Sequence, residues 1–186
     1  IEIKEIDQWF IKITDYADEL LSSLEELDWP ENVKLMQKNW IGKSFGAEIE
    51  YKIDASKDSL ITFSTRPDTI FGVSFLAISP NHPLAIKIAK DNEKISNFLE
   101  KCKEAKAAEA DMAKAEKLGI DTNLRVIHPL TGEKLPVWIG NFVLLDYGTG
   151  VVMGVPAHDS RDYEFAKKYN LNLSLIHISE PTRLSA

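Results

Sequence analysis

The sequence is poor in the residues that several kinds of site require. Cys102 is the only cysteine among 186 residues, so an internal disulfide is impossible, which fits a reducing compartment such as the cytoplasm. No cysteines and histidines have the spacing of zinc ligands, and we expect no metal site. Gly42-Lys43-Ser44 resembles the end of a phosphate-binding loop, but that motif needs a glycine where Gln37 stands. Disulfide scaffolds, zinc sites and P-loop sites are therefore excluded.

Long apolar runs and a basic charge balance are also missing. No apolar stretch reaches the roughly 20 residues of a membrane helix, and the polar opening residues 1–5 are unlike a secretory leader, so we expect no membrane partner. The formal net charge is −7, whereas a protein that grips a long nucleic acid through its phosphates is usually basic. The charge argues against autonomous binding of a whole RNA but leaves room for a pocket that holds one terminal nucleotide.

The residues that are present fit one domain with flanking elements. The chain is 44% hydrophobic and 27% charged, so it can bury a core. Hydrophobic periodicity predicts helices over 15–27, 31–41, 84–89, 93–117 and 160–169, and strands over 8–13, 47–53, 60–64, 73–78, 124–127, 135–139 and 150–155. Because strands and helices intermix without regular alternation, we predict an α/β, barrel-like fold rather than a doubly wound sheet.

One candidate site is the segment Ser64-Thr65-Arg66-Pro67-Asp68-Thr69, which places three hydroxyl groups around a rigid turn. Pro67 fixes its own φ and holds Arg66 extended. On one interpretation it is a plain turn, in which Asp68 or Thr69 caps a short helical turn. On the other, the hydroxyls surround a small ligand and a positioned water.

A second candidate site is the stretch from Gly148 to Asp162, a glycine-rich apolar strand that breaks at Pro156 and enters a helix. Asp159 is a natural N-cap, and Asp162 suits the positive end of the helix. Alternatively, the Asp162 carboxylate pairs with the ammonium group of a ligand, which would be a charge-assisted contact. The sequence alone leaves both interpretations open.

Two apolar positions and one aromatic residue flank this stretch. Met153 and Val155 alternate on a strand and therefore face one side, either in the core or in a pocket lining. Tyr147 is either an aromatic residue of a turn or a ligand contact. His82 and His128 each precede a proline in a turn, and we interpret both as structural.

Together the two segments resemble the editing domain of bacterial leucyl-tRNA synthetases. The resemblance covers residues 7–172 and includes Gln8-Trp9-Phe10 and the segments 39–44 and 128–134. It implies that residues 1–45 lead from the synthetic core into the editing domain, and that residues 46–172 form that domain, incomplete at its C-terminus. Asp68 points to the leucyl enzymes, since valyl and isoleucyl relatives typically carry tryptophan there.

The resemblance also implies roles for individual residues. Ser64 and Thr65 match hydroxyls near the scissile ester, although the family usually has threonine at position 64. The backbone near Arg66 faces the ester oxygen, and Asp162 binds the α-ammonium group, so these four are the expected catalytic residues. The expected substrate-binding residues are Thr69, which excludes the leucyl side chain, Tyr147, which contacts the terminal adenosine, Met153, Val155, Asp159 and Arg161.

The activity that follows from the resemblance is hydrolysis of mischarged tRNA(Leu) carrying norvaline, isoleucine or a similar amino acid. Editing needs no cofactor, whereas the parent ligase uses ATP and Mg²⁺ at a synthetic site whose sequence motifs are absent here. The expected partners are the 3′ end of tRNA(Leu) and the rest of the synthetase, in a cytoplasmic monomer. The alternatives are an inert truncated fragment with at most weak adenosine binding, or the editing domain of a valyl or isoleucyl relative.

The last residues of the chain have a different character. Residues 173–183 back-translate to a transposase adapter that is common in DNA library preparation. We therefore predict that residues 173–186 are a non-native tail and leave them out of the fold argument. The alternative is a native polar tail.

Overall fold

A computed structural model of the chain describes residues 7–106, 116–145 and 148–173. The chain divides into two compact units, Ile1–Phe45 and Gly46–Ala186, and each is described by itself. In chain order the elements are η1 (Ile13–Tyr16), α1 (Ala17–Ser23), α2 (Glu31–Ile41), β1 (Ala47–Ile53), β2 (Ser59–Ser64), η2 (Pro67–Gly72), β3 (Phe75–Ile78), α3 (Pro83–Ala89), α4 (Glu93–Lys106), β4 (Gly119–Ile127), β5 (Lys134–Gly140), β6 (Val151–Gly154) and α5 (Ser160–Lys168).

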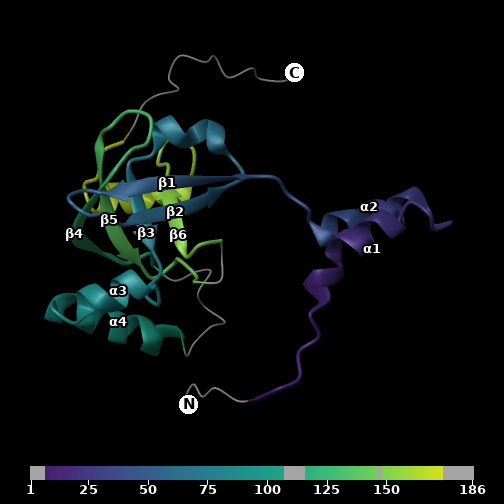
Figure 1. Cartoon of the computed structure of the whole chain (residues 1–186), viewed down its shortest axis with the longest axis horizontal. Coiled ribbons are helices and arrows are strands. Elements are labelled where there is room, and N and C mark those ends of the chain that lie inside the picture. The colour runs from purple at the N-terminus through teal and green to yellow at the C-terminus, as the bar shows by residue number, and fades with distance from the viewer. Residues whose placement is uncertain (1–6, 107–115, 146–147, 174–186) are drawn as a thin grey trace. The chain divides into compact units, whose positions relative to one another are not determined.

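The first unit contains the helices α1 and α2 (Figure 1). An ion pair of 2.6 Å joins Lys43 Nζ to Asp18 Oδ1, and Leu24 is buried. Helix α2 has the predicted bounds and ends at Gly42, whose φ of 64° suits glycine. The predicted strand over 8–13 is wrong: residues 8–12 have no regular structure and η1 begins at Ile13, because the described part of this unit offers no strand to pair with.

The second unit is built on a six-stranded sheet in the order β2-β1-β4-β5-β3-β6. All neighbouring strands are antiparallel except β3 and β5, which are parallel. Strand β1 has the predicted bounds, and its alternation of buried and exposed residues fits a strand with one face in the core. The predicted α/β mixture of strands and helices is confirmed.

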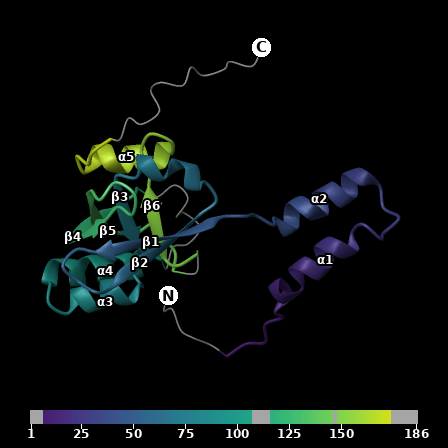
Figure 2. The ribbon, with the colours of Figure 1, turned by 45° about the horizontal axis from the view of Figure 1, so that its top comes forward.

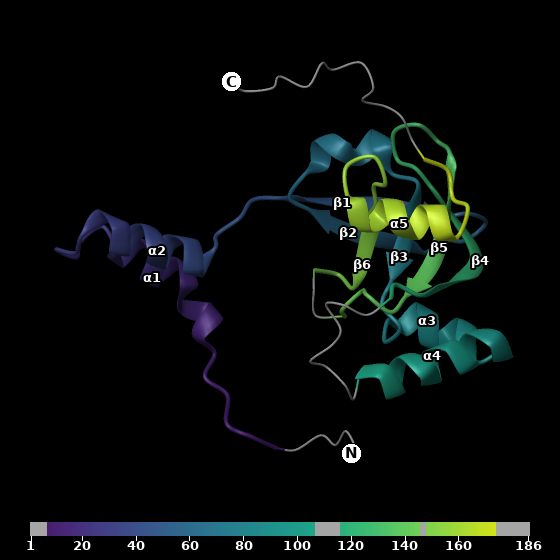
Figure 3. The same ribbon diagram turned by 180° about the vertical axis from the view of Figure 1, so that it is seen from behind.

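Helices cover the sheet on both sides (Figures 2 and 3). All residues of β3 are buried, because helices pack against both faces of this strand. Phe75 and Ala77 pack with Phe165 of α5, whereas Leu76 and Ile78 belong to the larger core, which also takes residues from α3 and α4. A strand buried on both faces reads as a continuous apolar run.

The two edges of the sheet approach each other without pairing. Strands β2 and β6 lie at opposite ends of the strand order, yet the Thr149 hydroxyl, just before β6, donates a hydrogen bond to the Ile61 carbonyl of β2. Among the described residues no ladder joins these strands. The predicted α/β, barrel-like architecture is therefore a curled, open sheet, and its site lies at the meeting of the two edges.

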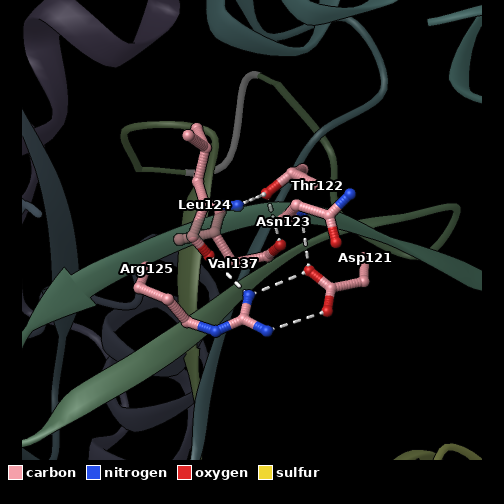
Figure 4. Close-up of polar contacts among 6 residues, drawn as sticks. All are labelled: Asp121, Thr122, Asn123, Leu124, Arg125 and Val137. Carbon is pink, nitrogen blue, oxygen red and sulfur yellow. Dashed lines mark hydrogen bonds and ion pairs between the residues drawn. The ribbon is translucent and has the colours of Figure 1, made fainter.

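Strand β4 is longer than predicted because it contains an irregularity. Its pairing with β5 shifts between Asp121 and Arg125, and Asn123 has a φ of 62°. Figure 4 shows the hydrogen bonds within the bulge: Asn123 N donates to Asp121 Oδ1 at 2.8 Å, and Arg125 pairs with the same carboxylate. The Thr122 hydroxyl donates to the Val137 carbonyl at 2.6 Å. The bulge interrupts the two-residue alternation, so the pattern predicts only the part of the strand that follows it.

The segment before β4 also differs from expectation. The predicted helix over 93–117 begins at Glu93, and α4 is described as far as Lys106. Residues 107–115 lie outside the described part, and residues 116–118 are not helical. Gly119 begins β4, where a Cβ atom would lie 2.6 Å from the Phe165 ring. The missing side chain at Gly119 therefore lets Phe165 of α5 pack closely against the start of β4.

Candidate functional site

A cavity of about 220 Å³ lies where the end of β2 and η2 face β6 and the start of α5. Its lining residues are Phe63, Ser64, Arg66, Thr69, Val152, Met153, Val155, His158, Asp159 and Asp162. The two segments singled out in the sequence thus meet in one cavity. Thr65 and Arg161 are exposed and do not line it, and Tyr147 lies outside the described residues.

Hydrogen bonds to the backbone of Arg66 fix the hydroxyl-rich turn. Ser64 Oγ accepts a hydrogen bond from Arg66 N at 3.1 Å, and Thr69 Oγ1 donates to the Arg66 carbonyl at 2.8 Å. The Thr69 side chain is only 5% exposed. Since the Thr69 hydroxyl proton is directed at a carbonyl, what Thr69 contributes to the cavity is volume. The Ser64 proton has no such acceptor among the described residues.

The Arg66 side chain is paired with Asp68. Arg66 Nη2 lies 2.8 Å from Asp68 Oδ2, and Nε lies 3.0 Å from Oδ1, so the contact is bidentate. Both side chains are exposed. The hydrogen bond with Arg66 lowers the pKa of Asp68, which keeps the carboxylate ionised. The pair gives the guanidinium one orientation at the mouth of the cavity.

Asp159 is the N-cap of α5, as one interpretation predicted. Its Oδ1 accepts hydrogen bonds from Arg161 N at 2.7 Å and Asp162 N at 3.3 Å. The Arg161 guanidinium lies 3.0 Å from the other carboxylate oxygen. This side-chain hydrogen bond is the main cause of the lowered pKa of Asp159. Arg161 therefore supports the cap from outside the cavity.

Asp162 does not cap the helix. Its Oδ2 accepts a hydrogen bond from Val155 N at 2.9 Å, which ties the first turn of α5 to the residue after β6. Burial is the largest influence on Asp162 and raises its pKa, because desolvation disfavours the charged form. No hydrogen bond to Oδ1 is found within the described residues. Asp162 is thus a half-buried carboxylate with acceptor capacity left for a cation.

Met153 and Val155 form the apolar wall of the cavity, and both also pack in or against the larger core. The buried Tyr51 hydroxyl donates to Met153 Sδ at 3.9 Å, and burial raises the pKa of Tyr51 to about 12. A Cβ atom on Gly72 would lie 2.9 Å from Val155 Cγ1. Glycine at the end of η2 therefore lets η2 approach this wall closely.

Sequence reasoning missed several residues of the site. Phe63 and Val152 line the cavity although they look like ordinary strand residues, and His158 lines it although no role was predicted for it. Tyr51 and His128 do not line the cavity. Tyr51 contacts Met153 and His128 contacts Ile70, and each partner is distant in the sequence. Phe63, Val152 and His158 lie in or next to the two candidate segments, so their position in the sequence could have indicated them. Tyr51 and His128 can be recognised only once the fold is known.

Two further kinds of feature are relevant to function: a metal-ligand cluster and a membrane-spanning helix. Residues 7–106, 116–145 and 148–173 contain no group of three or more histidine, cysteine, aspartate or glutamate side chains that could hold a metal ion. None of the helices in this part of the chain has the length and apolar character needed to cross a bilayer.

Comparison with known proteins identifies the family. The family model described as "Leucyl-tRNA synthetase, editing domain" matches residues 38–184. Among solved structures, the chain is similar to the agnB2 LeuRS of Agrobacterium radiobacter K84, determined as a ternary complex with tRNA and LeuAMS, with 34% sequence identity and a TM-score of 0.75. That match covers 96% of this chain and 22% of the Agrobacterium protein. The chain belongs to the leucyl-tRNA synthetase editing-domain family.

Membership in this family decides between two of the alternatives. A leucyl editing domain is what Asp68 indicated, and the comparisons do not favour a valyl or isoleucyl relative. The matched range also includes residues 173–184, most of the segment predicted to be non-native. Residues 174–186 lie outside the described part, so the origin of that tail stays a prediction.

Proposed function

We propose that this chain provides the editing site of a leucine–tRNA ligase and hydrolyses the ester that joins a noncognate amino acid to the 3′ end of tRNA(Leu). The observation that carries the proposal is the cavity of about 220 Å³, which joins the hydroxyl-rich turn to the Asp162 carboxylate. Family membership and the tRNA complex of the Agrobacterium protein support it.

In this proposal Asp162 binds the α-ammonium group of the amino acid, the feature that every aminoacyl ester shares. The half-buried carboxylate carries a raised pKa and uses one oxygen for Val155 N. An ammonium group at the other oxygen would offset the desolvation of the charge and form a charge-assisted hydrogen bond. The ester then extends from Asp162 toward the turn that holds Ser64 and Arg66.

Thr69 supplies the specificity by exclusion. One methylene gives a synthetic site only about 1–3 kcal/mol of discrimination, so a second site that hydrolyses the wrong products is useful. The buried Thr69 side chain is held by the Arg66 carbonyl and cannot easily rotate away. A leucyl side chain, which branches at Cγ, would meet this wall, whereas norvaline and isoleucine, which carry no branch at Cγ, would pass beside it.

Hydrolysis proceeds by placing a water molecule beside the ester. Ser64 accepts a hydrogen bond from Arg66 N, so its own proton is free to hold a water at the turn. The ribose hydroxyl of the tRNA supplies a second contact. Orientation of this kind can contribute about 7–11 kcal/mol to a reaction. The ligation reaction with ATP and Mg²⁺ is assigned to the rest of the synthetase, and neither group enters this step.

Single-turnover deacylation tests the proposal. The chain is mixed in excess with tRNA(Leu) that carries radiolabelled norvaline, isoleucine or leucine, and loss of the ester is followed. We expect faster hydrolysis of norvalyl- and isoleucyl-tRNA than of leucyl-tRNA. Equal rates for all three esters would remove the specificity claim. Rates at the spontaneous level, with only weak adenosine binding, would favour the inert fragment.

A further inference from the structure

His128 is a buried polar residue that does not line the cavity. It follows β4 and is only 2% exposed. Its Nδ1 accepts hydrogen bonds from Leu130 N at 3.2 Å and Thr131 N at 3.1 Å. An Nδ1 that accepts twice carries no proton, so the ring proton is on Nε2. Nε2 lies 3.0 Å from the carbonyl oxygen of Ile70, which can only accept, and His128 therefore donates to Ile70.

This hydrogen bond anchors η2 from a distant part of the chain. Ile70 directly follows Thr69, the proposed exclusion wall, and lies 58 residues before His128. The backbone hydrogen bonds of η2 itself are local: Thr69 N donates to the Arg66 carbonyl at 3.1 Å, and Val73 N donates to the Ile70 carbonyl at 3.2 Å. Local bonds define the shape of η2 but not its position against the sheet. The bond from His128 contributes to that position.

His128 is also linked, through Tyr51, to Met153 on the opposite wall of the cavity. Its ring meets the Tyr51 ring edge-on, with centroids 6.2 Å apart, and the Tyr51 hydroxyl donates to Met153 Sδ. On its other side the His128 ring stacks with Phe71 at 6.3 Å. One buried ring therefore connects the Thr69 side of the cavity with the Met153 side.

We propose that His128 is a positioning residue for specificity: it fixes the distance between Thr69 and Met153 and so sets which amino acid side chains fit. The inference rests on the proposed editing function. It adds a residue that touches no substrate but controls discrimination. Loss of the Nε2 bond should let η2 shift outward and admit leucine.

Two matched variants separate this role from support of the turn. An asparagine oxygen can take the place of Nδ1, so His128→Asn keeps the acceptor for Leu130 N and Thr131 N but loses the bond to Ile70. A glutamine amide can take the place of Nε2, so His128→Gln keeps the donor to Ile70 but loses the Nδ1 acceptor. Both variants lose part of the hydrogen bonding and should melt at lower temperature than the wild type.

The readouts are the leucyl-to-norvalyl ratio of deacylation kcat/KM and hydrogen exchange at the Thr69 and Val73 amides. We expect His128→Asn to raise the ratio about fivefold, the effect of one hydrogen bond, and to speed exchange at both amides, whereas His128→Gln keeps both near wild type. An equal shift in both variants, a shift in neither, or loss of cooperative melting in His128→Asn overturns the inference. The exchange arm needs no activity, so an inactive wild type would refute the editing function while exchange still decides the role of His128.

Discussion

The Asp162 carboxylate accepts a hydrogen bond from the backbone N–H of Val155 at 2.9 Å, and this bond connects the start of α5 with the end of β6. The helix end itself is capped by Asp159, so Asp162 is not needed as a cap. The Asp162 carboxylate is half-buried, its pKa is raised, and one of its oxygens can still accept a hydrogen bond. Such a carboxylate is suited to a cationic ligand. Four predictions test the roles assigned to Asp162, Asp159 and Thr69.

Asp162→Asn should abolish most of the hydrolysis of norvalyl-tRNA. The amide keeps the size and can still accept from Val155 N, but it cannot pair with an ammonium group. Loss of such a charged partner typically costs about 2–5 kcal/mol, at least tenfold in kcat/KM. Deacylation assays on wild type and variant measure this loss. If Asp162→Asn hydrolyses norvalyl-tRNA at the wild-type rate, Asp162 has only a structural role.

The pH dependence of stability should reveal the burial of Asp162. Because its pKa is raised in the folded chain, its favourable contribution is fully present below the unfolded value of 3.8 and is lost as pH rises through the folded value. The hydrogen bond from Val155 N is the largest influence that opposes this rise in pKa; Asp159 adds to the rise, and Lys117 and Arg161 oppose it. Asp162→Asn should therefore melt at a higher temperature than wild type at neutral pH, and the difference should shrink as pH falls toward 3.8. A difference that does not depend on pH would contradict the assignment.

Asp159→Ala should lower the free energy of unfolding. Its carboxylate caps α5 through Arg161 N and Asp162 N, and loss of such a cap costs about 0.5–2 kcal/mol. Chemical denaturation measures the free energy of unfolding. Asp159→Asn is the matched control, because asparagine also caps well, and it should recover most of the loss. Equal destabilisation by both variants would point to the ion pair with Arg161 instead.

Thr69→Ala should open the cavity to leucine. The Thr69 hydroxyl is used by the Arg66 carbonyl, so the wall depends on side-chain volume. Removing that volume should raise hydrolysis of leucyl-tRNA about tenfold or more. Thr69→Val keeps the volume without the hydroxyl and should keep most of the discrimination. If valine and alanine behave alike, the hydrogen bond rather than the volume sets specificity.

Local signals in the sequence predicted a large part of the fold and of the site. Helix α2 ends at Gly42 and β1 alternates from Ala47 to Ile53, so both elements have the expected bounds. The N-cap at Asp159 was also readable, because aspartate before a polar helix start is a strong signal. These features depend on residues only a few positions apart.

Features that depend on distant contacts could not be read in the same way. The bulge at Asn123 hid the first half of β4, and the bond from His128 to Ile70 spans 58 residues. The approach of β6 to β2, which the hydrogen bond from Thr149 to Ile61 bridges, likewise joins distant parts of the chain. Thr65 was expected beside the ester, yet it is exposed and outside the lining.

The most direct test of the central claim is the pKa of Asp162 in the presence of a stable ligand. Carboxyl carbon NMR can follow Asp162 in the chain alone and with the 3′-amide analogues of norvalyl- and leucyl-adenosine. The account predicts that the norvalyl analogue lowers the raised pKa of Asp162, because its ammonium group stabilises the carboxylate, and that the leucyl analogue does not. An Asp162 pKa that stays unchanged while the norvalyl analogue binds would contradict the account.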